Sequence, residues 1–204
     1  MVSTGAASTL VRSSWALQDP LLTEYYDREW GMPVRDDQGV FERLTLEAFQ
    51  SGLSWLTILR KRDAFRAAFH DFDPVPIAQY DEADVNRLLA DPGIIRNRLK
   101  IEATISNARA LIEMQAKGQS LAEVVWSYMP ESSPTPTEDS EVPSASDESV
   151  ALAKDLKHRG FRFVGPTTMY ALMCALGVVD VHLVSSHRRG CSGLWNRDGS
   201  RVEQ

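Results

Sequence analysis

The most informative segment of this 204-residue chain is Arg159-Gly160-Phe161-Arg162-Phe163-Val164-Gly165-Pro166-Thr167-Thr168. Helical periodicity precedes it over 149–158 and follows it over 167–176, so the pattern predicts two helices joined by a compact hairpin, with Thr167 capping the second. Hairpin amides flanked by Gly160 and Gly165, together with amides at the start of the second helix, can hold a phosphate group. An ordinary corner between two helices would show the same pattern, so the segment alone leaves both interpretations open.

Helical periodicity dominates the rest of the chain as well. Apolar residues recur at helical spacing over 39–50, 54–69, 81–89, 96–117 and 120–128. We expect Ser54 to cap the second of these helices and Asp73-Pro74-Val75-Pro76 to end it. The predicted fold class is therefore all-α.

Length and composition indicate one globular domain. Apolar residues make up 43% of the chain and charged residues 25%, which is typical of soluble proteins. We expect a flexible N-terminal tail over 1–14, the domain over 15–190, and a C-terminal tail over 191–204. Residues 130–146 are rich in Ser, Pro, Thr and acidic side chains, so we expect a mobile acidic loop inserted in the domain.

Other sequence features indicate where the protein is located and which kinds of partner it has. No apolar run reaches the length of a membrane span, and the first residues show neither a basic leader nor a continuous apolar stretch. We therefore expect a cytoplasmic, monomeric protein without a membrane or an obligate protein partner. Cys174 and Cys191 are the only cysteines, and they suggest no disulfide framework.

The net charge of −6 at first argues against a nucleic-acid partner, because Lys and Arg carry phosphate binding. The charge is unevenly distributed, however. The segment 131–149 contains no Lys or Arg, and its acidic residues alone carry a charge of −6, the same as the whole chain. They are Glu131, Glu138, Asp139, Glu141, Asp147 and Glu148. From Ala153 onward eight basic residues face four acidic ones, so a local basic face is compatible with an acidic protein.

A second candidate site combines aromatic residues with one carboxylate. Glu47 shares a face of the predicted helix 39–50 with apolar residues. The aromatic residues could be ordinary core and Glu47 a solvated surface group. Alternatively, they form a cage that stacks a planar cation while Glu47 supplies hydrogen bonds and the counter-charge. Beside a phosphate-holding hairpin, such a cage suggests recognition of a flipped base. The aromatic residues are Trp15, Tyr25, Tyr26, Trp30 and Trp55.

Five segments, in the same order, resemble the 3-methyladenine DNA glycosylase I family. The resemblance runs from about Trp15 to His182 and implies the all-α helix-hairpin-helix DNA glycosylase fold. The implied reaction is hydrolysis of the N-glycosidic bond of 3-methyladenine in alkylated double-stranded DNA, which leaves an abasic site. The segments are Asp19-Pro20-Leu21, Tyr25 to Pro33, Leu46 to Trp55, Gly93 to Arg98 and Arg159 to Thr168.

The resemblance also implies roles for individual residues. Glu47 matches the carboxylate that recognises the methylated base, and it is our first candidate for a catalytic group. Tyr25 and Trp55 match residues that contact and stack on the base, and Trp15 and Trp30 line the same pocket. Gly52 and Leu53 match the loop that probes the duplex beside the extruded nucleotide. The phosphate-binding hairpin corresponds to Phe163, Val164, Gly165, Thr167 and Thr168.

Two departures from the family pattern stand out, and the first concerns zinc. The family usually carries a structural zinc held by Cys and His side chains, at positions that here read Ser13, Tyr26, His182 and Ser186. One imidazole does not make the four-ligand site that structural zinc requires. His187 and Cys191 lie close in sequence to His182 and could rebuild part of a site. We expect no metal and no cofactor.

The second departure is Val179-Asp180-Val181-His182. The wider helix-hairpin-helix superfamily places an essential Asp in a very similar segment, whereas this family usually has none at that step. Asp180 could therefore stabilise positive charge on the sugar or position water. It could equally cap a turn or pair with a nearby Arg.

Two other functions remain compatible with the sequence. Loss of the zinc ligands is also what we would expect of a relative that binds damaged or modified bases without cleaving them. Alternatively, an enzyme of the same fold could act on another alkylated purine or a free nucleoside, because Ala48 and Phe49 beside Glu47 could reshape the pocket floor.

Overall fold

The computed structural model describes residues 10–203. The expectation of a flexible tail over 1–14 falls mostly outside this range. Within it, the protein is built from α-helices and short 3-10 turns without β-strands, which confirms the all-α class. The helices are α1 (Pro20–Arg28), α2 (Asp37–Gln50), α3 (Trp55–Leu59), α4 (Arg62–Ala68), α5 (Pro74–Ala78), α6 (Glu82–Ala90), α7 (Arg98–Ala116), α8 (Leu121–Ser127), α9 (Asp147–His158) and α10 (Pro166–Ala175).

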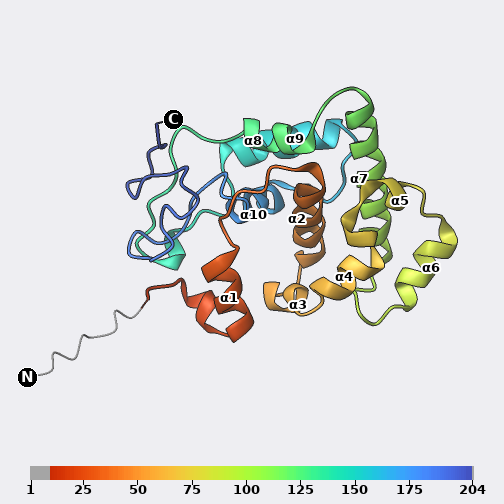
Figure 1. Ribbon diagram of the computed structural model, residues 1–204, viewed down its shortest axis with the longest axis horizontal. Coiled ribbons are helices and arrows are strands. Elements are labelled where there is room, and N and C mark those ends of the chain that lie inside the picture. The colour runs from red at the N-terminus through yellow and green to blue at the C-terminus, as the bar shows by residue number, and fades with distance from the viewer. Residues whose placement is uncertain (1–9, 204) are drawn as a thin grey trace, which may run out of the picture.

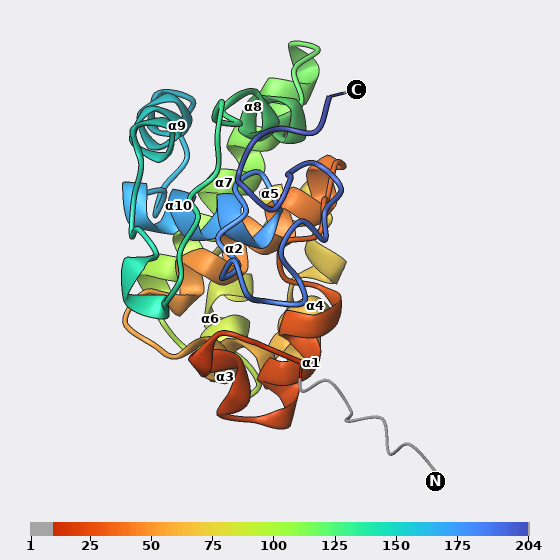
Figure 2. The ribbon, with the colours of Figure 1, turned by 90° about the vertical axis from the view of Figure 1, so that its left-hand side faces the viewer.

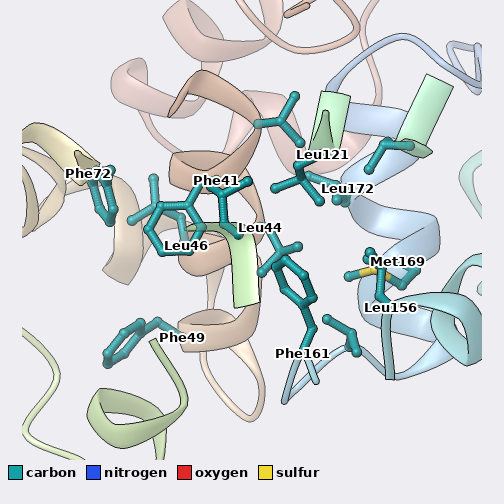
Figure 3. Close-up of a cluster of buried hydrophobic side chains, with 14 of the residues drawn as sticks. Phe41, Leu44, Leu46, Phe49, Phe72, Leu121, Leu156, Phe161, Met169 and Leu172 are labelled. Carbon is teal, nitrogen blue, oxygen red and sulfur yellow. The ribbon is translucent and has the colours of Figure 1, made fainter. Parts of the chain in front are cut away.

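Helix α2 forms the centre of the molecule, with α7 on one side and α10 on the other (Figure 1). Its apolar residues face neighbours in several directions, and Phe41, Leu44 and Phe49 are fully buried. Figure 3 shows Leu44 among side chains of α8, α9, α10 and the hairpin that follows α9, whereas Phe49 lies on the other side of α2, where it packs against Phe65 of α4. Because burial of such side chains is the main stabilising contribution to folding, α2 is the rigid element from which the site is built.

Two helix boundaries differ from the sequence predictions. The helix expected over 54–69 is divided into α3 and α4 by a turn at Arg60 and Lys61, where the Lys61 amide donates to the carbonyl of Ile58, three residues earlier, at 3.0 Å. Ser54 caps α3 as expected, accepting a hydrogen bond from the Thr57 amide at 3.2 Å. The segment 73–76 begins a helix rather than ending one. Asp73 caps α5 and Pro74 occupies its first position, where its missing N–H is not needed.

The hairpin between α9 and α10 is present, but its cap differs from the prediction. Gly165, not Thr167, occupies the N-cap of α10, and Pro166 is the first helical residue. The expectation that Thr167 caps this helix was therefore wrong. With Pro166 at the first position, Thr167 lies inside the first turn, where its main-chain amide has no partner within the helix.

Segments with tail-like or loop-like composition make specific contacts with the domain. In the acidic segment 130–146, the Ser133 hydroxyl donates to the Asp180 carbonyl at 3.0 Å, and Asp139 accepts from the Ser14 amide at 2.7 Å. In the C-terminal segment, Trp195 is buried and its indole donates to the Gly177 carbonyl at 3.1 Å. Figure 2 shows this segment lying across the helices. Both segments contribute packing that composition does not predict.

Among the helices of residues 10–203, none is both long enough and apolar enough to cross a lipid bilayer.

Candidate active site

A cavity of about 520 Å³ opens between α1, α2, α3 and α10. Helices α1 and α3 lie side by side at one end of the molecule and form one wall (Figures 1 and 2). The lining is mainly aromatic and aliphatic, with a few polar groups. It consists of Trp15, Gln18, Leu22, Tyr25, Trp30, Glu47, Gln50, Ser54, Trp55, Leu56, Val142, Pro143, Ser144, Thr167, Tyr170, Ala171, Cys174 and Val181.

Four of the aromatic residues expected to form a cage meet at this cavity. The Tyr25 and Trp55 rings lie 5.3 Å apart between centroids, and the Trp15 and Trp30 rings lie 5.2 Å apart edge to face. Such rings offer flat, electron-rich faces to a planar cation. Tyr26 does not line the cavity. It lies behind Trp30, with its ring stacked at 5.5 Å.

Glu47 is the only carboxylate among the residues that line this cavity. Burial leaves 7% of it exposed and raises its pKa to about 8, although the charge of Arg43, one turn earlier on α2, opposes this shift. Within the described part of the chain, its carboxylate accepts no hydrogen bond that would lower the pKa. The group therefore faces the cavity without a partner, and a cation in the cavity would favour its charged form.

Arg43 belongs to a charged group behind the pocket. Its guanidinium pairs with Glu29, which also accepts from Arg62 at 2.5 Å. These two arginines hold the pKa of Glu29 below its usual range against the opposing effect of burial. The pairing fixes the end of α1 to α2 and α4, and with it the positions of Tyr25 and Trp30.

Two polar atoms at the cavity lack a partner in the structure as described. The indole nitrogen of Trp55 and the hydroxyl of Tyr170 are both buried without a hydrogen bond. Buried polar groups are normally paired, so both are available to a ligand. Sequence analysis missed Tyr170, because α10 is apolar on nearly every side and its spacing does not single out one face.

The acidic segment also contributes to the cavity, which sequence analysis did not anticipate. Val142, Pro143 and Ser144 form part of its wall together with residues of α1, α2, α3 and α10. No local pattern indicates this, because the segment reaches the cavity through contacts with residues distant in sequence.

The residues expected to meet DNA lie on two exposed loops. Gly52 has φ +81° and an open surrounding, and Leu53 beside it is 40% exposed. In the hairpin, Phe163 has φ +57° and is exposed, whereas the Val164 side chain is fully buried, so only its main chain can face a phosphate. Gly165, Thr167 and Thr168 form the start of α10, where main-chain amides point outward.

The four positions expected to correspond to zinc ligands meet in space. Ser13, Tyr26, His182 and Ser186 are all buried, and the Tyr26 and Ser186 hydroxyls hydrogen-bond at 2.8 Å. Hydroxyl groups are not the thiolate and imidazole ligands of structural zinc, so these residues do not fit the metal, although the His182 Nε2 atom lacks a partner.

Within residues 10–203, His182, His187 and Cys191 are not gathered into a group that could hold a metal ion. His187 contacts the Val11 carbonyl at 2.9 Å and Asp27 at 3.1 Å. Among residues 10–203, no group of three or more His, Cys, Asp or Glu side chains is placed to hold a metal ion.

Asp180 lies outside the cavity lining and is 5% exposed. One carboxylate oxygen accepts from His182 Nδ1 at 2.8 Å, and the other accepts from the Gly190 amide at 2.8 Å. Burial opposes ionisation, but the hydrogen bond from His182 keeps the pKa of Asp180 below its usual value. The structure thus separates Asp180 from the cage and joins it to the C-terminal segment.

Comparisons with protein families, with known proteins and with solved structures agree with one another. Residues 15–189 match the family model described as methyladenine glycosylase. The chain is 48% identical over 176 residues to DNA-3-methyladenine glycosylase 1 of Escherichia coli K12, covering 85% of this chain and 94% of that protein. A crystal structure of 3-methyladenine DNA glycosylase I superposes with a TM-score of 0.84 and 46% identity, covering 87% and 98% of the two chains. A structure that describes 3-methyladenine recognition by the Staphylococcus aureus enzyme has a TM-score of 0.79 and 36% identity, covering 84% and 93%.

Proposed function

Because the chain belongs to the methyladenine glycosylase family, we propose that it is a DNA-3-methyladenine glycosylase. It extrudes 3-methyladenine from alkylated duplex DNA and hydrolyses the N-glycosidic bond, leaving an abasic site. The observation that carries the proposal for this chain is the buried, unpaired Glu47 carboxylate in an aromatic cavity of about 520 Å³. A flipped, positively charged purine has the shape and charge that this cavity accepts.

The pocket acts mainly by selecting and orienting the base. A methylated adenine that carries positive charge is already a good leaving group, so the protein does not have to supply a strong acid. Water adds to the sugar carbon as its bond to the base breaks. Glu47 accepts hydrogen bonds from the base and balances its charge, while Tyr25 and Trp55 stack on it. Unmodified adenine lacks that charge, so burying Glu47 against it is unfavourable.

Trp15 and Trp30 close the cavity on the side of α1. The unpaired Trp55 indole and Tyr170 hydroxyl are suited to contact the base or its sugar. The wall formed by Val142–Ser144 limits the size of base that enters. Together these groups hold the lesion in one orientation, which is the main requirement for hydrolysing a bond to a good leaving group.

The two exposed loops engage the duplex on either side of the flipped nucleotide. Leu53 is the side chain that enters the stack, and the positive φ of Gly52 gives the turn that presents it. Main-chain amides from Phe163 to Thr168 hold a phosphate. These contacts are local, so the net charge of −6 does not prevent DNA binding.

For Asp180 we propose a positioning role rather than a catalytic one. Its carboxylate oxygens already accept hydrogen bonds from His182 and Gly190, and it does not reach the cavity. It holds the segment that carries Val181, which does line the cavity.

We further propose that this member functions without zinc. Pairing of the Tyr26 and Ser186 hydroxyls replaces metal bonds at the same place in the fold. The N-terminal segment that carries Trp15 is held by two further contacts, a bidentate Arg12–Asp27 ion pair and the Ser14–Asp139 hydrogen bond.

The test is chromatography of free bases released from N-methylated duplex DNA by wild type and Glu47→Gln. Glu113→Gln, at an exposed position of α7, is the matched control. We expect release of 3-methyladenine by wild type and control, and a large loss in Glu47→Gln. Release of a different purine would reassign the substrate. A folded protein that binds this DNA without releasing any base would instead be a reader of damage.

A further inference from the structure

Helix α7 carries three buried polar side chains on one face, Lys100, Thr104 and Asn107. The Thr104 hydroxyl donates to the Lys100 carbonyl within the helix at 3.0 Å, whereas Lys100 and Asn107 make hydrogen bonds outside it. They lie seven residues apart, which is about two helical turns, or about 10 Å along the helix. Neither lines the cavity. Lys100 bonds to the main chain where α2 ends and the first of the proposed DNA-contacting loops begins, and Asn107 bonds to the main chain of the second, the hairpin.

Lys100 is 7% exposed, and its ammonium donates to the Phe49 carbonyl at 2.8 Å and to the Ser51 carbonyl at 2.7 Å. These are carbonyls at the C-terminal end of α2, which have no partner within the helix. A positive charge is favoured there by the helix dipole. Burial lowers the pKa of Lys100, because removing a charged ammonium group from water costs free energy.

The contact reaches the loop that presents Leu53. Directly after Ser51, Gly52 adopts φ +81°, and the Leu53 amide donates back to the Gln50 carbonyl at 2.6 Å. Glu47 lies one turn before this end of α2. By holding both the last turn of α2 and the residue that follows it, Lys100 fixes the direction in which Leu53 leaves the helix.

Asn107 is 1% exposed and makes a two-point contact with Arg162 in the hairpin. Its side-chain nitrogen donates to the Arg162 carbonyl at 3.1 Å, and its oxygen accepts from the Arg162 amide at 2.7 Å. The next residue, Phe163, has φ +57°, a conformation that a side chain of this size rarely adopts without support. The contact with Asn107 supplies that support from outside the hairpin.

We propose that α7 is a spacer that sets the separation of the base-probing loop and the phosphate-holding hairpin, with Lys100 and Asn107 as its positioning residues. This inference rests on the proposed function, because it assigns the two loops to one DNA duplex. Stacked base pairs and backbone phosphates have a fixed spacing. Two loops attached to one rigid helix can therefore engage both at once with little loss of conformational entropy on binding.

The experiment compares Lys100→Met, Asn107→Leu and Leu53→Ala, alone and in pairs, with Lys117→Met as the matched control at the exposed far end of α7. Single-turnover release of 3-methyladenine from duplex DNA reports loop engagement. Binding of free 3-methyladenine, followed by tryptophan fluorescence, reports the pocket alone. We expect each α7 variant to slow release about ten- to a hundredfold with unchanged binding of free base.

The double variants identify the route of the effect. If Lys100 acts through the probing loop, Lys100→Met slows release far less in a Leu53→Ala background, whereas Asn107→Leu keeps its effect there. Additive effects of Lys100→Met and Leu53→Ala would overturn the inference. So would a loss of free-base binding as large as the loss of release, since that is a general structural defect. Where a variant does not fold, Lys100→Gln and Asn107→Asp, which each keep one polar contact, replace it in the same comparison.

The two proposals fail differently. Wild type that releases no 3-methyladenine contradicts the proposed function. Wild type that releases it while Lys100→Met and Asn107→Leu match the Lys117→Met control contradicts the spacer alone.

Discussion

The pKa of about 8 at Glu47 predicts an unusual pH dependence for lesion recognition. Only the ionised carboxylate balances a cationic base, and below pH 8 the free protein holds most of this group protonated. At pH 7, one unit below the pKa, about a tenth of the molecules carry the charge, whereas at pH 9 about nine-tenths do. We therefore expect kcat/KM for 3-methyladenine release to rise about tenfold from pH 7 to pH 9.

The groups that face Glu47 support this assignment. Burial raises the pKa of Tyr25 and Cys174 far above this range, and the pKa of Arg43 is also raised, so none of them changes charge between pH 6 and 9. Binding of the cation stabilises the charged carboxylate, so the rise should be weaker in kcat, which reports the bound state.

The assay is a pH series of base release from N-methylated duplex DNA, corrected for spontaneous loss of 3-methyladenine without protein. Glu47→Gln should be slower and flat across the range, because its amide does not titrate. At pH 9, the lost charge-assisted hydrogen bond corresponds to about 1.5–3 kcal/mol, or about ten- to a hundredfold in kcat/KM. A wild-type profile that is flat or falls from pH 7 to 9, or a Glu47→Gln variant with the wild-type slope, would refute this reasoning.

Four further predictions concern Leu53, the buried polar residues Tyr26 and Asp180, and the zinc content of the protein. Leu53→Ala should slow release from duplex DNA about tenfold or more and leave free-base binding unchanged, because the side chain is exposed outside the cavity. Tyr26→Phe should lower the free energy of unfolding in urea by about 1 kcal/mol, through loss of its hydrogen bond to Ser186. Asp180→Asn should lower it by about 3 kcal/mol, because the carboxylate is buried against His182 and Arg189, while release per folded molecule stays the same. Protein purified without chelators should contain far less than one zinc per chain, and EDTA should leave its Tm unchanged.

Each of these has a clear contrary result. Leu53→Ala that weakens free-base binding would place this side chain in the pocket. A Tyr26→Phe protein as stable as wild type would show that the buried hydroxyl pair contributes nothing to stability. Slower release of 3-methyladenine by fully folded Asp180→Asn would show that this carboxylate has a catalytic role. A content of about one zinc per chain would contradict the proposal that the protein functions without zinc.

Sequence patterns predicted the all-α fold class correctly. Helical periodicity is a local property, and it located α2, α6, α7, α8, α9 and α10 to within a few residues. The predicted helix over 54–69 is interrupted in the structure by a turn at Arg60 and Lys61. The roles of Glu47 and the aromatic residues remain predictions that follow from the resemblance, to which the structure adds their meeting at one cavity.

Properties that depend on distant neighbours required the tertiary structure. Glu47 has a shifted pKa only because α1, α3 and α10 remove it from water, and no spacing within α2 shows this. The acidic segment joins the pocket wall through partners far away in sequence.

The sequence by itself determined which segments are helical and which residue types could recognise a cationic base, because periodicity and side-chain chemistry depend only on the residues and their local order. Only the tertiary structure decided which of those residues share a cavity, that the Tyr26 and Ser186 hydroxyls pair, and that Lys100 and Asn107 bond to two separate segments of main chain. Burial, desolvation and hydrogen-bond pairing are set by the whole surroundings of a group, and those surroundings exist only once the chain has folded.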